Sequence, residues 1–289
     1  MVLFKSSVMP ALLEILQKGR DFLVKKGFSP KEADYESRFI LSFLLGKKLL
    51  DIYQEKEVPP LVAKKFFMLL EKRSQGVPAA YLLGEVEFFG CLFKVGPGVL
   101  IPRPETEILV ETALNLLPEG SYLLELGVGS GCISITLALE RPSFKIIGVD
   151  ISSQALAYTI QNLKRYGLEK KLLLVRGNWL SPFKETHFFN AILSNPPYVA
   201  KNEWETLDKE VKLHEPQEAL LAGEEGLDFI AETLKKAPGF LKPPGYVILE
   251  IGYRQREKVA SLAEKLGYKY FFVKDLSGHH RVLVAKYSL

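Results

Sequence analysis

The tetrapeptide Asn195-Pro196-Pro197-Tyr198 has residue types that can hold a planar amide or amino group. It follows the apolar run Phe188 to Leu193, which predicts a strand that ends at this turn. Proline lacks a backbone N–H and keeps the preceding residue extended, so the turn is stiff and rich in acceptors. The side-chain oxygen of Asn195 and the carbonyl oxygen of Pro196 can each accept one hydrogen of an NH2 group, while Tyr198 can lie against its flat face. Taken alone, the pattern also fits an ordinary turn after a strand.

A glycine-rich loop lies upstream, at Glu125-Leu126-Gly127-Val128-Gly129-Ser130-Gly131. Its alternating glycines let the backbone turn tightly and let a ligand approach main-chain atoms without meeting a β-carbon. A dinucleotide fingerprint requires glycine or alanine where Cys132 stands, so the loop favours a ligand other than NAD. Asp150 ends the following strand, where an acidic residue is expected to hydrogen-bond two ribose hydroxyls. The loop, Asp150 and Asn195 each follow a strand, which predicts one site at the carboxyl edge of a sheet.

The second half of the chain has the pattern of an α/β fold. After Gly120, short apolar strands alternate with amphipathic helices, as in a parallel sheet that is covered on both faces. The segment 274–280 is too short for a parallel crossover, so the last two strands should pair antiparallel. The predicted strands of this seven-stranded mixed sheet are 122–126, 145–149, 172–175, 189–193, 246–251, 270–273 and 281–285.

Residues 1–80 predict a small helical domain with three helices. Ser29-Pro30 resembles an N-cap followed by proline at the first helical position, and that helix should end at Gly46. A further helix should begin at Pro59-Pro60. Aromatic and β-branched residues with turn glycines then predict a β-hairpin linker at 81–101, which leaves 102–289 for the α/β domain.

Composition limits the class of protein. The 289 residues are 47% hydrophobic and 25% charged, without a clean secretory segment or an apolar run of membrane-spanning length, so we expect a cytoplasmic globular protein. Cys91 and Cys132 match no metal-ligand spacing, so we expect reduced thiols and no metal site. Residues 1–80 carry 14 Lys and Arg against 9 Asp and Glu, whereas the remainder carries 24 against 25. The basic surplus fits either an acidic or RNA-associated partner or solvated helix faces.

The chain resembles the HemK-like release factor glutamine N5-methyltransferases, the PrmC family, over essentially its whole length. This resemblance implies a Rossmann-like class I methyltransferase fold and S-adenosyl-L-methionine as cofactor, with S-adenosyl-L-homocysteine as product. It also implies methylation of the glutamine in the Gly-Gly-Gln motif of bacterial class 1 peptide chain release factors, a step that belongs to translation termination. Beyond the glycine loop and the tetrapeptide, the matching residues are Ile101-Pro102-Arg103-Pro104-Glu105-Thr106-Glu107, Asn178-Trp179, Glu215-Pro216, Ala219-Leu220, Gly226-Leu227, Glu250-Ile251-Gly252, Asp275, Gly278 and Arg281.

The resemblance also implies roles for single residues. The substrate glutamine is expected on Asn195, Pro196, Pro197 and Tyr198, of which Asn195, Pro196 and Tyr198 are the catalytic candidates. The residues expected to bind the cofactor are Gly127, Val128, Gly129, Ser130, Gly131, Asp150, Trp179 and Asn195.

Several side chains have two interpretations. Trp179 can pack on adenine or be a buried core aromatic. Glu105 and Glu107 can favour the start of a helix, approach the cofactor, or hold Arg103. Glu250 ends a central strand, where it can simply order loops.

Other functions share some of these features. A glutamine methyltransferase of a ribosomal protein would share the fold and the tetrapeptide. A DNA adenine or RNA guanine methyltransferase would present a similar NH2 group, but it should carry a basic groove, and the α/β part is nearly neutral. A dehydrogenase is disfavoured by Cys132, and a scaffold without catalysis is disfavoured by Asn195 and Asp150. We therefore expect a release factor as partner, recognised by the helical domain, with no membrane and no direct nucleic-acid contact.

Overall fold

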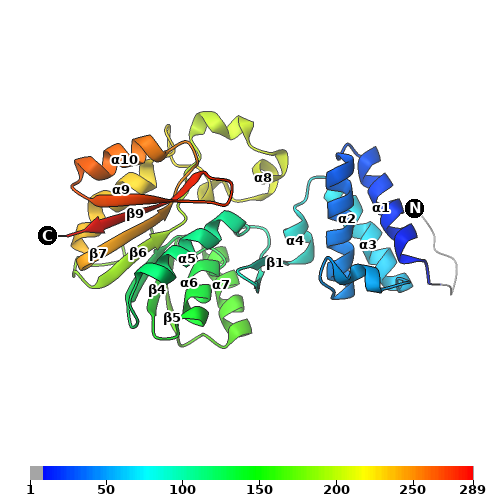
Figure 1. The fold of residues 1–289 in the computed structure, drawn as a ribbon, viewed down its shortest axis with the longest axis horizontal. Helices are drawn as coiled ribbons and strands as arrows, with labels where there is room; N and C mark the ends of the chain where they lie inside the picture. The colour runs from blue at the N-terminus through cyan, green and yellow to red at the C-terminus, as the bar shows by residue number, and fades with distance from the viewer. Residues whose placement is uncertain (1–8, 289) are drawn as a thin grey trace. The chain divides into compact units, whose positions relative to one another are not determined.

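The computed structural model describes residues 9–288, and the chain forms two compact units (Figure 1). The first, called here the helical unit, contains the residues up to Gly84 together with Lys209–His214. The second, called here the sheet unit, contains Glu85–Asp208 and the residues from Glu215 onward. Residues 1–8, part of the N-terminal segment in which we expect no secretory signal, lie outside the described part.

The helical unit is built around an apolar core that includes Ile15, Leu23, Ile40 and Phe66. The helix predicted after Ser29 is confirmed: Ser29 Oγ accepts the backbone N–H of Glu32, and the Glu32 carboxylate accepts that of Ser29, which forms a capping box. The short helix α4 was not predicted. The elements are α1 (Leu12–Lys25), α2 (Pro30–Leu45), η1 (Asp51–Gln54), α3 (Pro60–Ser74), α4 (Ala79–Leu83) and α8 (Lys209–His214).

Two ion pairs of the buried Arg73 connect α8 to the rest of the helical unit. Arg73 on α3 pairs with Glu36 of α2 at 2.9 Å and with Glu210 of α8 at 2.7 Å. Burial alone would lower the pKa of Arg73, but the hydrogen bonds and charges of these two carboxylates raise it above its ordinary value. The Arg73–Glu210 ion pair thereby connects a segment that is distant in sequence.

The sheet unit contains a seven-stranded sheet in the order β5-β4-β3-β6-β7-β9-β8. The first five strands in this order are parallel, and β9 is antiparallel to both β7 and β8, as predicted. The strands are β3 (Tyr122–Leu126), β4 (Lys145–Asp150), β5 (Leu172–Arg176), β6 (Phe189–Ser194), β7 (Leu241–Glu250), β8 (Lys269–Lys274) and β9 (His280–Tyr287).

Helices cover both faces of this sheet. Figure 1 shows α5, α6 and α7 on one face and α9 and α10 on the other. Neighbouring residues of a strand therefore enter different cores: Leu123 packs with α5 and α6, whereas Leu124 packs with α9 and α10. The elements are α5 (Glu107–Leu116), α6 (Cys132–Glu140), α7 (Ser153–Tyr166), α9 (Asp228–Lys236), α10 (Arg256–Lys265), η2 (Pro104–Thr106), η3 (Lys201–Thr206), η4 (Gln217–Ala219) and η5 (Ala237–Gly239).

The start of β7 differs from the prediction. The sequence placed this strand at 246–251, whereas it begins at Leu241. Phe189 of β6 pairs with Leu241 and Ala191 pairs with Tyr246, so the intervening segment bulges out of the ladder. The two prolines in that bulge have no N–H to donate and therefore conceal the true start of the strand.

The predicted hairpin is formed by β1 (Glu85–Phe88) and β2 (Cys91–Lys94). Phe89 and Gly90 at its tip have φ of 51° and 71°, the left-handed pair that a tight two-residue turn requires. The N–H of Phe89 donates to Glu107 Oε1 at 2.7 Å, so Glu107 holds the hairpin. Cys91 and Cys132 are not joined by a disulfide in this structure. Within residues 9–288, no helix is long and apolar enough to cross a membrane.

Candidate active site

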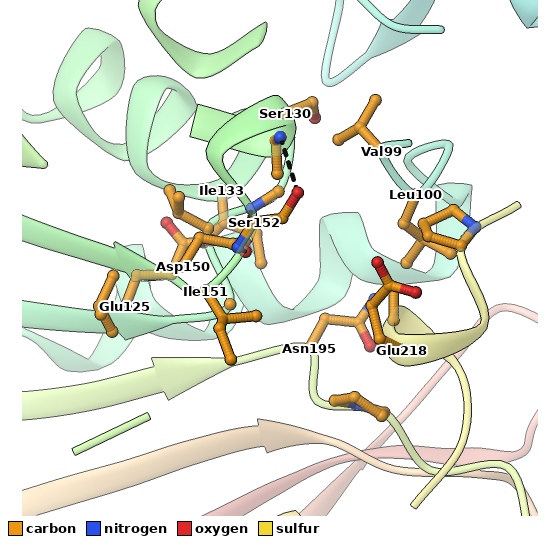
Figure 2. Close-up of a pocket in the computed structure, with 18 of the residues that line it drawn as sticks. Val99, Leu100, Glu125, Ser130, Ile133, Asp150, Ile151, Ser152, Asn195 and Glu218 are labelled. Atoms are coloured by element: carbon orange, nitrogen blue, oxygen red, sulfur yellow. Dashed lines mark hydrogen bonds between the residues drawn. The ribbon is translucent and has the colours of Figure 1, made fainter. Parts of the chain in front are cut away.

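The candidate site lies where three adjacent strands end. Strands β4, β3 and β6 are neighbours in the sheet, and they carry Asp150, the glycine loop and Asn195 at their carboxyl ends. Residues from all three line one pocket of about 220 Å³ (Figure 2). Figure 2 also shows Leu100 and Glu218 across the pocket from Glu125 and Asp150. The predicted convergence of the three motifs at one sheet edge is what the structure contains.

The glycine loop owes its shape to left-handed backbone angles. Gly127, Gly129 and Gly131 have φ of 72°, 57° and 83°, which residues with a side chain rarely adopt. A β-carbon on Gly131 would lie 2.8 Å from Thr159 Cγ2, so this position also has no space for one. The hydroxyl of Thr159 donates to the carbonyl oxygen of Gly129 at 2.7 Å. The loop is thus held open toward the pocket, with Ser130 buried and lining it. Val128 also lines the pocket.

Asp150 joins two turns through its carboxylate. One oxygen accepts the N–H of Gly129 at 2.9 Å, and the other accepts the N–H of Ser152 at 2.9 Å. Burial raises the pKa of Asp150, while these backbone hydrogen bonds act against the shift. Each oxygen keeps a second lone pair and can still accept a hydrogen bond from a ribose hydroxyl. That contact stays a prediction.

Glu125 is a fully buried carboxylate that also lines the pocket. Its Oε2 accepts from both the backbone N–H and the hydroxyl of Ser134, whereas Oε1 has no hydrogen-bond partner among residues 9–288. Burial raises the pKa of Glu125 to about 8, although the two hydrogen bonds from Ser134 act against the shift. Sequence reasoning did not count Glu125 as a site residue, although a charged side chain inside an apolar strand was a signal.

Asn195 stands at the boundary between two cavities. It lines the large pocket and also a cavity of about 30 Å³ that is lined by Pro196 and Tyr198. Leu100 and Ala219 line both cavities as well. A group held at Pro196 and a ligand in the large pocket would therefore meet at Asn195.

Hydrogen bonds through Thr106 and Glu250 hold the Asn195 carboxamide. Its Nδ2 donates to Thr106 Oγ1 at 3.1 Å, and the Thr106 hydroxyl donates to Glu250 Oε2 at 2.6 Å. Tyr198 donates its hydroxyl to the other oxygen of Glu250 at 3.3 Å, and burial raises the pKa of Tyr198 above its ordinary value. Glu250 therefore contacts the site, beyond the loop-ordering role considered for it.

The segment from Glu215 to Leu221 runs across the site. Glu215 is buried, and it accepts from Arg103 at 2.5 Å and from the N–H of Ile101 at 3.2 Å. This corrects the suggestion that Glu105 or Glu107 holds Arg103, because the buried Glu215 occupies the guanidinium group. Sequence reasoning noted Glu215 in a matching motif but missed its partner, 112 residues away.

Trp179 is a core aromatic that also borders the pocket, and its contact with adenine stays a prediction. Its indole N–H donates to Thr233 Oγ1 at 2.8 Å and its ring packs on Phe229, so it belongs to the core beneath the sheet. Trp179 also lines the large pocket, and so does Phe229. Its polar edge is already hydrogen bonded, so Trp179 presents only apolar ring atoms to the pocket.

The chain matches two protein families. Residues 14–84 match the PrmC N-terminal domain, and residues 104–242 match the methyltransferase small domain. The release factor glutamine methyltransferase of Aquifex aeolicus is 38% identical over 91% of this chain and 95% of its own length. That of Thermodesulfovibrio yellowstonii is 36% identical over 96% and 99%. The chain belongs to the release factor glutamine methyltransferase family. A methyltransferase of Pyrococcus furiosus shares the fold, with 20% identity over 70% of this chain and 91% of its own, and a TM-score of 0.53.

The pocket of this family member fits S-adenosyl-L-methionine, the cofactor of such methyltransferases. The unpartnered Oε1 of Glu125 can accept from an ammonium group, and the three glycines of the loop have no β-carbon to obstruct a nucleoside. Asp150 can accept from ribose hydroxyls, and Trp179 and Phe229 can pack against adenine. Among residues 9–288, no cluster of His, Cys, Asp and Glu could hold a metal ion.

The titration of Glu125 should appear in cofactor binding. Below pH 8 most Glu125 is protonated and neutral, and above it the carboxylate is charged, so affinity for the cationic cofactor should increase as the pH rises through 8. Glu125→Gln should weaken binding and remove this part of the pH dependence. Isothermal titration calorimetry of both proteins from pH 6.5 to 9 checks the prediction. Identical pH profiles for the two proteins would show that Glu125 does not sense the ligand.

Proposed function

We propose that this protein transfers the methyl group of S-adenosyl-L-methionine to the N5 amide nitrogen of the glutamine in the Gly-Gly-Gln motif of bacterial class 1 release factors, in the cytoplasm. Membership of the release factor glutamine methyltransferase family supports the substrate. The observation that carries the chemistry is the position of Asn195 between a large pocket and a small cavity lined by Pro196 and Tyr198. This arrangement suits a cofactor on one side and a carboxamide on the other.

The chain's contribution is to orient a weak nucleophile. The lone pair of an amide nitrogen is delocalised into its carbonyl group, whereas the bound cofactor supplies a methyl group that is already activated on a cationic sulfur. Asn195 Oδ1 and the Pro196 carbonyl oxygen can each accept one N–H of the substrate amide, which holds the nitrogen in place. The same two oxygens stabilise the positive charge that develops on nitrogen as the new bond forms. The surplus proton then leaves to water.

Recognition of the whole factor is assigned to the helical unit in this proposal. The match to the PrmC N-terminal domain and exposed apolar side chains such as Leu50 and Leu61, 83% and 81% exposed, support a protein-binding surface there. Intact release factor should therefore be a better substrate than a short Gly-Gly-Gln peptide. Serine at both positions should reduce that advantage while cofactor affinity stays unchanged.

The substrate is tested with an isotopically labelled methyl donor and three acceptors: a release factor, ribosomal proteins and DNA. Release factor alone should gain one methyl group, and peptide mapping by mass spectrometry should place it on the glutamine of the Gly-Gly-Gln motif. Labelling of a ribosomal protein or of DNA in place of the release factor would overturn the assignment.

Asn195→Ala removes one of the two proposed acceptors. By analogy with the loss of one oxyanion-hole donor, kcat should fall by about 10²–10³-fold. The matched control is Asn190→Ala, because Asn190 lies near the other end of β6, where it accepts the N–H of Tyr122 at 2.8 Å. Steady-state kinetics should show near-normal kcat for this control. A folded Asn195→Ala protein with normal kcat and cofactor affinity would rule out the proposed role.

A further inference from the structure

Two buried side chains behind the tetrapeptide have no role in the mechanism described so far. Thr106 and Glu250 are 2% and 1% exposed, and they form a chain of hydrogen bonds that ends on Asn195. Glu250 comes from the end of β7 and Thr106 from η2, so two separate elements meet behind the turn. Because bulk water is excluded, the few donors and acceptors present determine the geometry.

The donors and acceptors in the series Asn195–Thr106–Glu250 fix which group donates in each hydrogen bond. An ionised carboxylate can only accept, so Thr106 must use its single hydroxyl hydrogen on Glu250. The Thr106 oxygen then offers only lone pairs to Asn195, and it can bond only to the NH2 end of the carboxamide. The oxygen end of Asn195 must therefore point away from Thr106.

The orientation of Asn195 matters because its two ends have nearly the same shape and opposite chemistry. If the carboxamide turned over, its NH2 group would face the NH2 group of the substrate, and two donors cannot bond to each other. The acceptor that orients the substrate nitrogen would be lost without any change in the shape of the site.

We propose that Thr106 and Glu250 are positioning residues that lock the Asn195 carboxamide with Oδ1 facing the amide of the substrate glutamine. The inference rests on the proposed function and adds the residues that set its geometry. Glu250 lines neither cavity, whereas Thr106 also lines the large pocket next to Asn195. In this proposal both residues act through Asn195.

The lock should loosen in mild acid. Burial raises the pKa of Glu250 to about 7, and nearby Glu105 of η2 adds to the shift, while Thr106, Arg281 of β9 and Tyr198 oppose it. As the pH falls through 7, Glu250 gains a proton and can donate to Thr106, whose own hydrogen is then free to turn toward Asn195. The fraction of Asn195 in the productive orientation, and with it kcat, should therefore fall below pH 7.

The first test compares Thr106→Val with Thr106→Ser. Valine keeps the shape of threonine without the hydroxyl, so kcat should fall about tenfold, the effect of one net hydrogen bond, with KM for the cofactor nearly unchanged. Serine restores the hydroxyl and should restore most of kcat. Thr136→Val is the matched control, because Thr136 is buried on α6 and its hydroxyl has no partner among residues 9–288.

A double-mutant cycle separates positioning from a structural effect. If Thr106 acts through Asn195, Thr106→Val should change kcat less than about twofold once Asn195 is alanine. An equal loss in both backgrounds would overturn the inference, and so would an unchanged kcat for Thr106→Val in the otherwise wild-type enzyme. Glu250→Gln, which preserves the shape of the side chain, should lower kcat and remove its fall below pH 7. A pH profile that this variant leaves unaltered would contradict the role of Glu250.

The orientation can also be read without turnover. In the NMR spectrum of the full-length protein, the Asn195 side-chain amide hydrogen bonded to Thr106 should exchange slowly with solvent in the wild type and in Thr106→Ser, and faster in Thr106→Val. Equal exchange in all three proteins would refute the lock whatever the substrate is. If the wild type methylates no release factor although these exchange rates differ, the proposed function fails and the lock stands.

Discussion

Three neighbouring parallel strands that end at the same edge of a sheet are the constraint on which the rest of this structure depends. Strand β3 is paired with β4 on one side and β6 on the other, so the glycine loop, Asp150 and Asn195 leave the sheet at adjacent points. The chain continues from β3 to β4 and β5 on one side and then returns to β6 on the other side, and such a reversal opens a crevice for a ligand at that edge. Helices pack on both faces of the sheet and fix the strands, so the positions of the site residues at the strand ends are well defined.

Two buried carboxylates are the chemical counterpart of this geometry. Burying a carboxylate is costly unless hydrogen bonds compensate, and both Glu125 and Glu250 have such partners. Oε1 of Glu125 has no hydrogen-bond partner among residues 9–288. Glu250 accepts the hydroxyl hydrogen of Thr106, whose oxygen accepts from the Asn195 amide. The resulting environment is rich in acceptors, which suits a cationic methyl donor and a nitrogen that becomes positive during the reaction.

Local features of the sequence predicted most of this fold. The bounds of β3 were predicted correctly because the apolar run there is delimited by a polar residue and a glycine. The start of β7 was missed because prolines obscure it, and α4 was missed because one turn and a half of helix has little periodicity. The glycine loop and Asn195 could be found because each motif is contiguous in sequence.

The supporting contacts could not be found in that way. Thr106 and Glu250 are 144 residues apart, and Asn195 and Thr106 are 89 apart, so only the folded sheet brings them together. The matching segments that contain Thr106, Glu215 and Glu250 were visible in the sequence, but nothing in them indicates which partner each residue selects. Such pairings depend on tertiary geometry that no local pattern encodes.

The central claim is that Asn195 and Pro196 grip a substrate carboxamide through two acceptor oxygens. The most direct measurement is a crystal structure of this protein with S-adenosyl-L-homocysteine and the Gly-Gly-Gln domain of a release factor. The account predicts that Asn195 Oδ1 and the Pro196 carbonyl oxygen both lie about 3 Å from the glutamine amide nitrogen, with Asn195 Nδ2 on Thr106. A glutamine bound elsewhere, or an Asn195 whose Nδ2 faces the substrate, would contradict it.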